Sequence, residues 1–406
     1  MYIFGNFSLL HRDQIVPTVD DLSKSDDRSP RPVIGWWSAD PRQLTGQGIV
    51  TARVVAMLER VDAPAFSYRG SGMQSISTWL LSGLRLAGYL LRRRLGTLYL
   101  VCSRSNAGFI RDLPAYFSLF AGVRVIVHVH GSDIVDLCQR PCLGVIARTL
   151  LARCELVVPS AHLIAPLQAL GVRKIHLCEN FVEHANPLLQ SIEVHQLTAA
   201  GREWRVLWNS NVMASKGFFQ VAEAVGILSD EGVRVRLITL GKPIGDEAMS
   251  LQSCSAALQR LEGKHWIERP GQVDRPTAMR LLYASDIVCL PSYYASECQP
   301  LTLIEAMCAA RPLVIADTPA LRATVGDYSC EIVTEQSTAA VKAALQRLFL
   351  MPPADEVLHA AAEQARKRFS AQRFDYTMHR LFGLNASAAD VGAVDRVHDL
   401  DEHTKL

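Results

Sequence analysis

The chain has 406 residues, of which 49% are hydrophobic and 20% are charged. This length exceeds the size at which a single hydrophobic core stops growing, so two domains are expected. A net charge of only +2 argues against a general nucleic-acid binder. The charge is uneven, because residues 1–190 hold 20 Lys and Arg against 14 Asp and Glu, whereas residues 191–406 hold 22 against 26. The first half is therefore expected to contact an anionic surface or substrate.

Short apolar segments that suit buried strands alternate with longer helical patterns along the chain. In chain order, the predicted elements of the first half are helices at 48–60 and 75–94 and strands at 97–102, 123–129, 155–159 and 174–178. Those of the second half are strands at 205–209, 233–240, 286–290 and 312–316, and helices at 216–230, 275–284 and 301–310. Such alternation is typical of parallel sheets covered on both faces. Two series of this kind predict two doubly wound α/β domains, with ligands bound at the carboxyl ends of the strands.

The polar stretch near residues 184–204 is the predicted join between the domains. We therefore expect a first domain over residues 1–190 and a second over 191–370. Residues 19–32 suggest a mobile loop and residues 386–406 a polar tail. No secretory signal or membrane-spanning segment is evident. Ten scattered cysteines without a C-x-x-C pair indicate free thiols and a cytoplasmic location.

Two glutamates stand in the otherwise apolar segment SECQPLTLIEAM, residues 296–307. Glu297 falls in a predicted strand-to-helix loop, and Glu305 lies within the helix that follows. The backbone N–H groups of Leu301 and Thr302 at the helix start can bind an anion. A phosphate there, between two carboxylates, describes a nucleotide-sugar site in which Glu305 contacts ribose and Glu297 the sugar. A capping Glu297 and a salt-bridged Glu305 are the alternative on the residues alone.

The longer run PSYYASECQPLTLIEAMCAARPLVIAD, residues 291–317, resembles the signature of glycosyltransferase family 4. This signature has two glutamates separated by seven residues, then a helix of small residues and a strand. The segment LWNSNVMASKGFFQVAEAV, residues 207–225, is similar to the family's Lys-Gly motif, in which Lys216 would bind the donor diphosphate. Many members have an arginine where this chain has Asn211.

A histidine pair ends the predicted strand in IVHVHGSD, residues 126–133. His128 and His130 would share one face of the strand, as metal ligands do, but no third ligand accompanies them. By resemblance, His130 matches a family histidine that contacts the sugar beside the acceptor, whereas His128 is expected to be structural. The resemblance also implies a reaction without a metal or another cofactor.

The resemblance extends over most of the chain. Gly46 and Gly48 stand where the family has a Gly-rich loop, and residues 178–183 resemble its hinge. Residues 366–382 resemble the family's last helix, which crosses back to the first domain. We expect that crossover at residues 371–385. The implied catalytic residues are Glu297 and His130. The implied donor-binding residues are Lys216, Glu305, Leu301, Thr302, Gln299, Asn211, Gly48 and Gly46.

These features predict the GT-B fold, with two Rossmann-like domains facing each other across a cleft. The implied activity is a retaining transfer of a sugar from a nucleotide-diphosphate sugar to a saccharide or lipid-linked saccharide, in bacterial surface polysaccharide synthesis. Alternatives are a sugar-nucleotide epimerase or phosphorylase, and a non-catalytic membrane-associated subunit with the same fold. The segment WLLSGLRLAGYLLRRR, residues 79–94, suggests peripheral contact with an anionic membrane, although an ordinary packed helix is the alternative.

Overall fold

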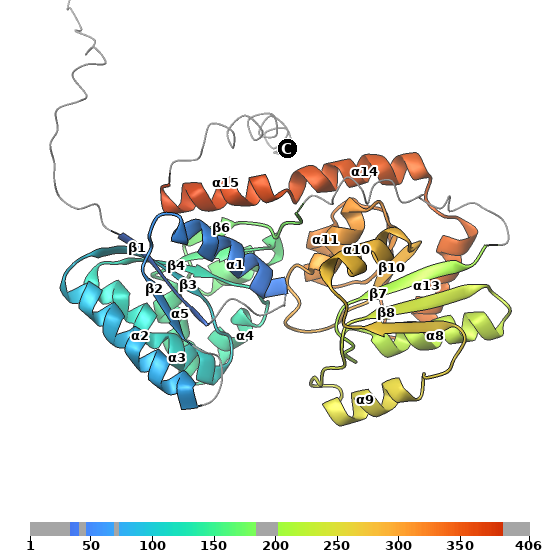
Figure 1. The fold of residues 1–406 in the computed structure, drawn as a ribbon, viewed down its shortest axis with the longest axis horizontal. Coiled ribbons are helices and arrows are strands. Elements are labelled where there is room, and N and C mark those ends of the chain that lie inside the picture. The colour runs from blue at the N-terminus through green and yellow to red at the C-terminus, as the bar shows by residue number, and fades with distance from the viewer. Residues whose placement is uncertain (1–32, 40–45, 69–72, 184–201, 385–406) are drawn as a thin grey trace, which may run out of the picture.

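The computed structural model describes residues 33–39, 46–68, 73–183 and 202–384, and it contains two parallel sheets arranged side by side (Figure 1). The first sheet has the order β2-β1-β3-β4-β5-β6 and the second the order β12-β11-β10-β7-β8-β9. All strand pairs in both sheets are parallel. The prediction of two doubly wound α/β domains is confirmed.

The elements of the first domain follow one another as alternating strands and helices. They are β1 (Val33–Ala39), α1 (Gly46–Glu59), β2 (Ala65–Tyr68), α2 (Met73–Leu91), β3 (Leu95–Val101), α3 (Asn106–Phe117), η2 (Ser118–Ala121), β4 (Arg124–His128), α4 (Ile134–Gln139), α5 (Leu143–Leu151), β5 (Glu155–Val158), η3 (Ala161–Leu163), α6 (Ile164–Ala169) and β6 (Lys174–Leu177).

Alternate residues of the central strands enter two separate cores, one on each face of the first sheet. Trp37 and Leu100 pack with α2, α3, α4 and α5, whereas Trp36 and Tyr99 pack with α1 and with α15 (Ala371–Phe382) from the far end of the chain. This two-residue period is the expected geometry of a strand buried on both faces.

The second domain repeats the pattern around one large core. Its elements are β7 (Trp204–Asn209), α8 (Phe218–Asp230), β8 (Val235–Leu240), α9 (Leu251–Gln259), β9 (Ile267–Gly271), α10 (Arg275–Tyr283), β10 (Ile287–Leu290), α11 (Leu301–Cys308), β11 (Leu313–Ala316), α12 (Pro319–Val325), β12 (Cys330–Val333), α13 (Thr338–Leu350) and α14 (Asp355–Arg368).

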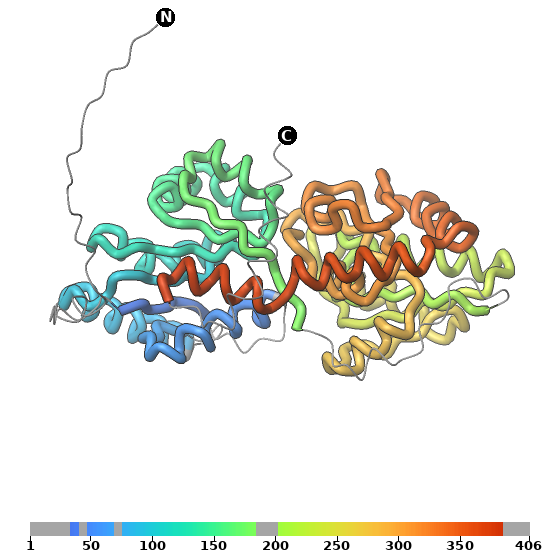
Figure 2. The backbone as a smooth tube through the Cα atoms, turned by 90° about the horizontal axis from the view of Figure 1, so that it is seen from above, coloured from blue at the N-terminus to red at the C-terminus, as the bar shows by residue number. Residues whose placement is uncertain are grey.

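The last two helices lie along both domains, α14 over the second and α15 over the first (Figure 2). The resemblance predicted a helix over 366–382, but the helix is interrupted at Phe369 and Ser370, where Ser370 caps α15. Val182 of the connecting segment donates its N–H to the Phe369 carbonyl at 3.0 Å, so the link between the domains and this interruption meet. Arg53 of α1 holds α15 through Asp375, with two N–O distances of 2.6 Å.

Three predicted features lie outside the described residues: the loop at 19–32, the tail at 386–406 and the domain boundary at 190/191. None of the helices in the described segments has the length and apolarity to cross a bilayer. All ten cysteines are free, and eight of them are buried.

Candidate active site

The predicted donor residues gather at the carboxyl edge of the second sheet. In this sheet the chain runs from β7 outward through β8 and β9, then returns to β10 on the other side. The point between β7 and β10 where the direction reverses is where doubly wound sheets bind ligands. The loop after β7 supplies Lys216, and the loop and helix after β10 supply Glu297 and Glu305.

Lys216 and Glu297 form an ion pair in which Nζ lies 3.1 Å from Oε2. Ser292 donates its hydroxyl to the same Glu297 oxygen at 3.0 Å, and Lys216 also donates to the Ser210 hydroxyl at 3.3 Å. The ammonium lies 5.7 Å from the ring centroid of Tyr294. Both charged side chains are mostly buried, with exposed fractions of 15% and 11%. The structure thus joins the two residues that the sequence predicted for the diphosphate and the sugar.

Glu305 is buried beneath the same edge and has two partners. Arg275, the first residue of α10, donates to Glu305 Oε1 at 2.8 Å, and Asn209, the last residue of β7, donates to Oε2 at 3.2 Å. Burial raises the pKa of Glu305, while Arg275 and Asn209 lower it in part. The salt-bridged Glu305 that we considered as an alternative is therefore present, and Arg275 is a partner that the sequence did not indicate.

The start of α11 presents its first backbone N–H groups without a side-chain cap. Pro300 is the N-cap residue of this helix, one position before its first turn, and no side chain caps it. The N–H groups of Leu301 and Thr302 have no acceptor within the helix, as in any first helical turn. The Thr302 hydroxyl donates to the carbonyl of Asn209, so its side chain holds β7 and α11 together.

The loop that holds Glu297 is also bound by the first domain. Ser132, which follows β4, donates its hydroxyl to the Glu297 carbonyl, and its N–H reaches the Ser296 carbonyl at 3.4 Å. Cys298 enters the hydrophobic core of the first domain. Gln299 accepts from the Asn180 N–H at 2.6 Å and donates to Glu179 at 3.1 Å.

These contacts assign Gln299 to the connection between the domains, where its side-chain amide is bound by two residues of the hinge segment. Arg368 at the end of α14 completes this connection by donating to Glu179 at 2.6 Å.

His130 lies where β4 approaches this loop, and its ring is 4.1 Å from that of His128. His128 is fully buried and its Nδ1 lies 2.8 Å from the Tyr99 hydroxyl, an arrangement typical of a structural histidine. Burial lowers the pKa of His128 to about 3 and, together with His128 and Arg104, holds the pKa of His130 well below its usual range. Both rings are therefore neutral at pH 7. In the described segments, no three His, Cys, Asp or Glu residues are placed to hold a metal ion.

The predicted glycines and Asn211 are less closely joined to this group. Gly217 has a φ of +85°, and a Cβ there would lie 2.5 Å from the Pro291 carbonyl oxygen, so close packing against the end of β10 requires a glycine. Asn211 is partly exposed in the same loop as Lys216. Gly46 and Gly48 form the first turn of α1, which starts near the junction of the domains (Figure 1).

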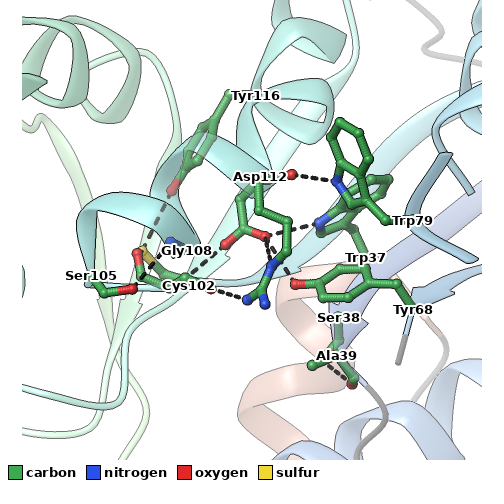
Figure 3. Close-up of polar contacts among 12 residues, drawn as sticks. Trp37, Ser38, Ala39, Tyr68, Trp79, Cys102, Ser105, Gly108, Asp112 and Tyr116 are labelled. Carbon is green, nitrogen blue, oxygen red and sulfur yellow. Dashed lines mark hydrogen bonds and ion pairs between the residues drawn. The ribbon is translucent and has the colours of Figure 1, made fainter. Parts of the chain in front are cut away.

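A buried carboxylate organises the corresponding edge of the first sheet (Figure 3). Asp112 of α3 is fully buried and accepts from Trp37 Nε1 at 3.1 Å, Tyr68 OH at 3.0 Å and the Ser103 N–H at 3.1 Å. These partners come from β1, the end of β2 and the segment after β3. Burial raises the pKa of Asp112, and its hydrogen bonds oppose that change. The network fixes the strand ends that face the second domain, and the sequence analysis missed it because its members are 9 to 75 positions from Asp112.

Comparison with known proteins gives a family match for the second domain and a fold match for the whole chain. Residues 192–368 match the family model described as glycosyl transferases group 1. No curated protein matches the chain. Among solved structures, it is similar to a sucrose-phosphate synthase from Thermosynechococcus elongatus, with a TM-score of 0.66 and 16% identity over 87% of this chain and 98% of that one.

Two further structures show the same fold. Anabaena HepE in complex with UDP and glucose has a TM-score of 0.62 and 14% identity, over 86% of this chain and 99% of that one. The lipopolysaccharide outer core galactosyltransferase WaaB has a TM-score of 0.59 and 13% identity, over 86% and 99%. Residues 192–368 thus match the group 1 glycosyltransferase model, within a chain that has the GT-B fold.

Proposed function

We propose that this protein is a retaining, family 4-like glycosyltransferase that moves a sugar from a nucleotide-diphosphate donor to an acceptor hydroxyl. The observation that supports this most directly is the convergence of Lys216, Glu297 and Glu305 where the order of the second sheet reverses. One cation and two carboxylates at that point match the three parts of a nucleotide sugar, namely diphosphate, sugar and ribose.

The bond between the anomeric carbon and the diphosphate breaks with its electron pair leaving on the diphosphate. Lys216 and the N–H groups at the start of α11 are placed to stabilise that charge, without a metal in the proposed reaction. Glu297 would stabilise the positive charge that develops on the sugar, and Glu305 would bind the ribose hydroxyls. The acceptor oxygen then bonds to the anomeric carbon, and its proton passes to the departing diphosphate oxygen, on the side where His130 lies.

The choice of substrates is a proposal drawn from relatives. HepE was solved with UDP and glucose, and WaaB is a lipopolysaccharide galactosyltransferase. We therefore propose a UDP-hexose as the first donor to test, and a saccharide or lipid-linked saccharide of a bacterial surface polysaccharide as acceptor. The reaction would take place in the cytoplasm, at the inner face of the membrane.

An exposed apolar surface on the first domain supports the membrane contact. Leu84 and Leu91 of α2 are 72% and 86% exposed, and Phe120 of η2 is 74% exposed. Residues 73–124 contain seven arginines and one acidic residue, Asp112, which is fully buried. Three of these arginines, Arg104, Arg111 and Arg124, pair with carboxylates, whereas Arg85 and Arg92–Arg94 lie in α2 or directly after it. Large apolar side chains beside this second group of arginines match an interface with anionic lipid.

A panel of UDP-, GDP- and ADP-sugars tests the function by thermal shift, followed by product analysis with candidate acceptors. We expect one donor class to raise the melting temperature, and the glycoside formed to keep the donor's anomeric configuration in its NMR spectrum. An epimerised nucleotide sugar or a sugar phosphate as the product would favour the alternative enzymes. Stabilisation by no nucleotide sugar would contradict the proposal.

A further inference from the structure

Arg104 of the first domain is a second cation beside the loop that holds Glu297. It follows β3, and its Nε lies 2.8 Å from Asp133 Oδ1. Its guanidinium group lies against Gly131, because a Cβ built on that glycine would be 2.0 Å from Arg104 Nη1. The side chain is 22% exposed, so it is largely buried but still reached by solvent.

Close contacts connect this cation to the candidate donor site. Asp133 and Gly131 flank Ser132, whose hydroxyl donates to the Glu297 carbonyl. The pKa of the Cys298 thiol is raised to about 12, mainly by burial; Arg104 lowers it and Glu297 raises it. Cys298, which directly follows Glu297, packs in the hydrophobic core of the first domain, to which Arg104 belongs.

Three buried polar atoms at this place have no hydrogen-bond partner among the described residues: Arg104 Nη1, His130 Nε2 and Asp133 Oδ1. Asp133 Oδ1 is the oxygen that forms the ion pair with Arg104 Nε, so Arg104 Nη1 and His130 Nε2 are the two atoms without a partner of either kind. The guanidinium lies against Gly131, the residue directly after His130, and burial, His128 and Arg104 together lower the pKa of His130. Asp133 binds the guanidinium through Nε, so the ion pair leaves Nη1 without a hydrogen-bond acceptor. A buried donor without an acceptor is costly, and an arginine fork suits planar or tetrahedral oxyanions.

We propose that Arg104, together with the neutral His130, binds an oxyanion of the substrate between the domains. This inference rests on the proposed function and adds to it that the first domain supplies a cation to the bound donor. Two groups offer the required chemistry: the donor diphosphate and a carboxylate on the transferred sugar.

The test uses calorimetric titration of the full chain with inorganic pyrophosphate, and with UDP-glucuronate compared against UDP-glucose. If the diphosphate is the ligand, Arg104→Met should weaken pyrophosphate binding at least tenfold. If a sugar carboxylate is the ligand, Arg104→Met should leave pyrophosphate binding unchanged and remove a preference for UDP-glucuronate over UDP-glucose. A variant that changes neither measurement overturns the proposal.

A second variant, Asp133→Asn, keeps the Arg104 guanidinium and should strengthen oxyanion binding instead of weakening it. Asp133 makes no capping hydrogen bond to α4, so Asp133→Asn should fold normally while it releases Arg104 from its carboxylate. We expect it to strengthen oxyanion binding several-fold, and unchanged or weaker binding would count against the proposal. Arg111→Met is the matched control: Arg111 lies beside the Tyr68 ring rather than Ser132, and binding should persist.

Lys216→Met separates this inference from the proposed function. If Lys216→Met abolishes pyrophosphate binding but Arg104→Met changes neither titration, only the role of Arg104 fails. If the unchanged protein binds neither pyrophosphate nor any UDP-sugar, the proposed function fails as well.

Discussion

The ion pair between Lys216 and Glu297 leads to a prediction in which catalysis and nucleotide binding change in opposite directions. Glu297→Gln keeps the size of the side chain and an oxygen that can accept from Ser292, but it removes the charge that faces Lys216 at 3.1 Å. Lys216 then becomes fully available to the donor diphosphate. We expect kcat to fall while the affinity for a nucleoside diphosphate stays the same or rises.

The magnitudes follow from the burial of the pair. A group that stabilises charge only in the transition state typically contributes a hundredfold or more to kcat, or about 2.7 kcal/mol. With 15% and 11% exposure, the two side chains are only partly screened by solvent. Removing the competing carboxylate should therefore strengthen diphosphate binding by up to about 1.4 kcal/mol, which is about tenfold.

Glu305→Gln is the matched control, since it makes the same chemical change eight positions away. Its carboxylate faces Arg275 and Asn209 and is proposed to bind ribose before and during the reaction. Its loss should raise KM more than it lowers kcat, and should weaken UDP binding by roughly 1.5–3 kcal/mol. Calorimetry with UDP, steady-state kinetics and thermal melts decide the matter. Our assignment is refuted if Glu297→Gln loses more UDP affinity than Glu305→Gln; if both variants keep full turnover, the glutamates are structural.

Three further predictions concern the first domain. His130→Ala should lower turnover strongly while UDP affinity and melting temperature stay near their original values; a larger loss of turnover in a folded His128→Ala protein would reverse the two roles. Because the pKa of His128 is lowered to about 3 by burial, the unfolded chain binds a proton near pH 6.5 that the folded protein does not. Stability should thus be full above pH 6.5 and fall as the pH drops, with His128 accounting for about 1.4 kcal/mol at about pH 5.5. Urea unfolding at about pH 7.5 and about pH 5.5 gives the decrease in the free energy of unfolding, which should be smaller by this amount in His128→Gln than in the original protein. An equal decrease in both proteins would show that His128 is not its source. Because burying a leucine contributes about 1.5–3 kcal/mol, Leu84→Asp should reduce binding to anionic vesicles at least tenfold without lowering the melting temperature. Equal binding of the original protein to neutral and anionic vesicles would contradict the electrostatic part of the proposed membrane contact.

The sequence predicted the central strands β5 and β10 well because their apolar runs are continuous and fully buried. Predicted strands at 155–159 and 286–290 correspond to β5 and β10, in which every residue is buried. The strands β2, β9 and β12 were not predicted, since each lies at an edge of its sheet and has exposed or half-buried positions. Pro270 further hides β9, because proline within an apolar segment usually argues against a strand.

The central strand β1 was missed for a different reason. Its sequence VIGWWSA contains Gly35, which weakens a strand pattern in isolation. In the folded chain a Cβ at this position would lie 2.8 Å from the Phe66 ring and 2.9 Å from a Leu95 methyl group. The glycine is therefore needed for close packing of neighbouring strands, and that requirement is set by residues far along the chain.

The candidate site shows the same limit. Lys216, Glu297 and Glu305 could be predicted because they belong to short motifs with fixed spacing. Arg275 and Arg104 could not, because their partners Glu305 and Asp133 are 30 and 29 positions away and no local pattern relates them. Such contacts are defined by the order of strands in a sheet, which periodicity alone does not reveal.

The loop at residues 296–299 belongs structurally to both domains, and this divides the proposed site into two parts. Lys216 donates to Ser210 and Glu305 accepts from Arg275, all within the second domain, so the parts proposed for these two residues in binding the diphosphate and ribose depend on that domain's own packing. The backbone of Glu297 is bound by Ser132 of the first domain, while its carboxylate is bound by Lys216 of the second. The position of the carboxylate proposed to be catalytic therefore depends on how the two domains meet. It follows that loss of the contact between Ser132 and the Glu297 backbone should alter transfer of the sugar more than it alters binding of the nucleotide.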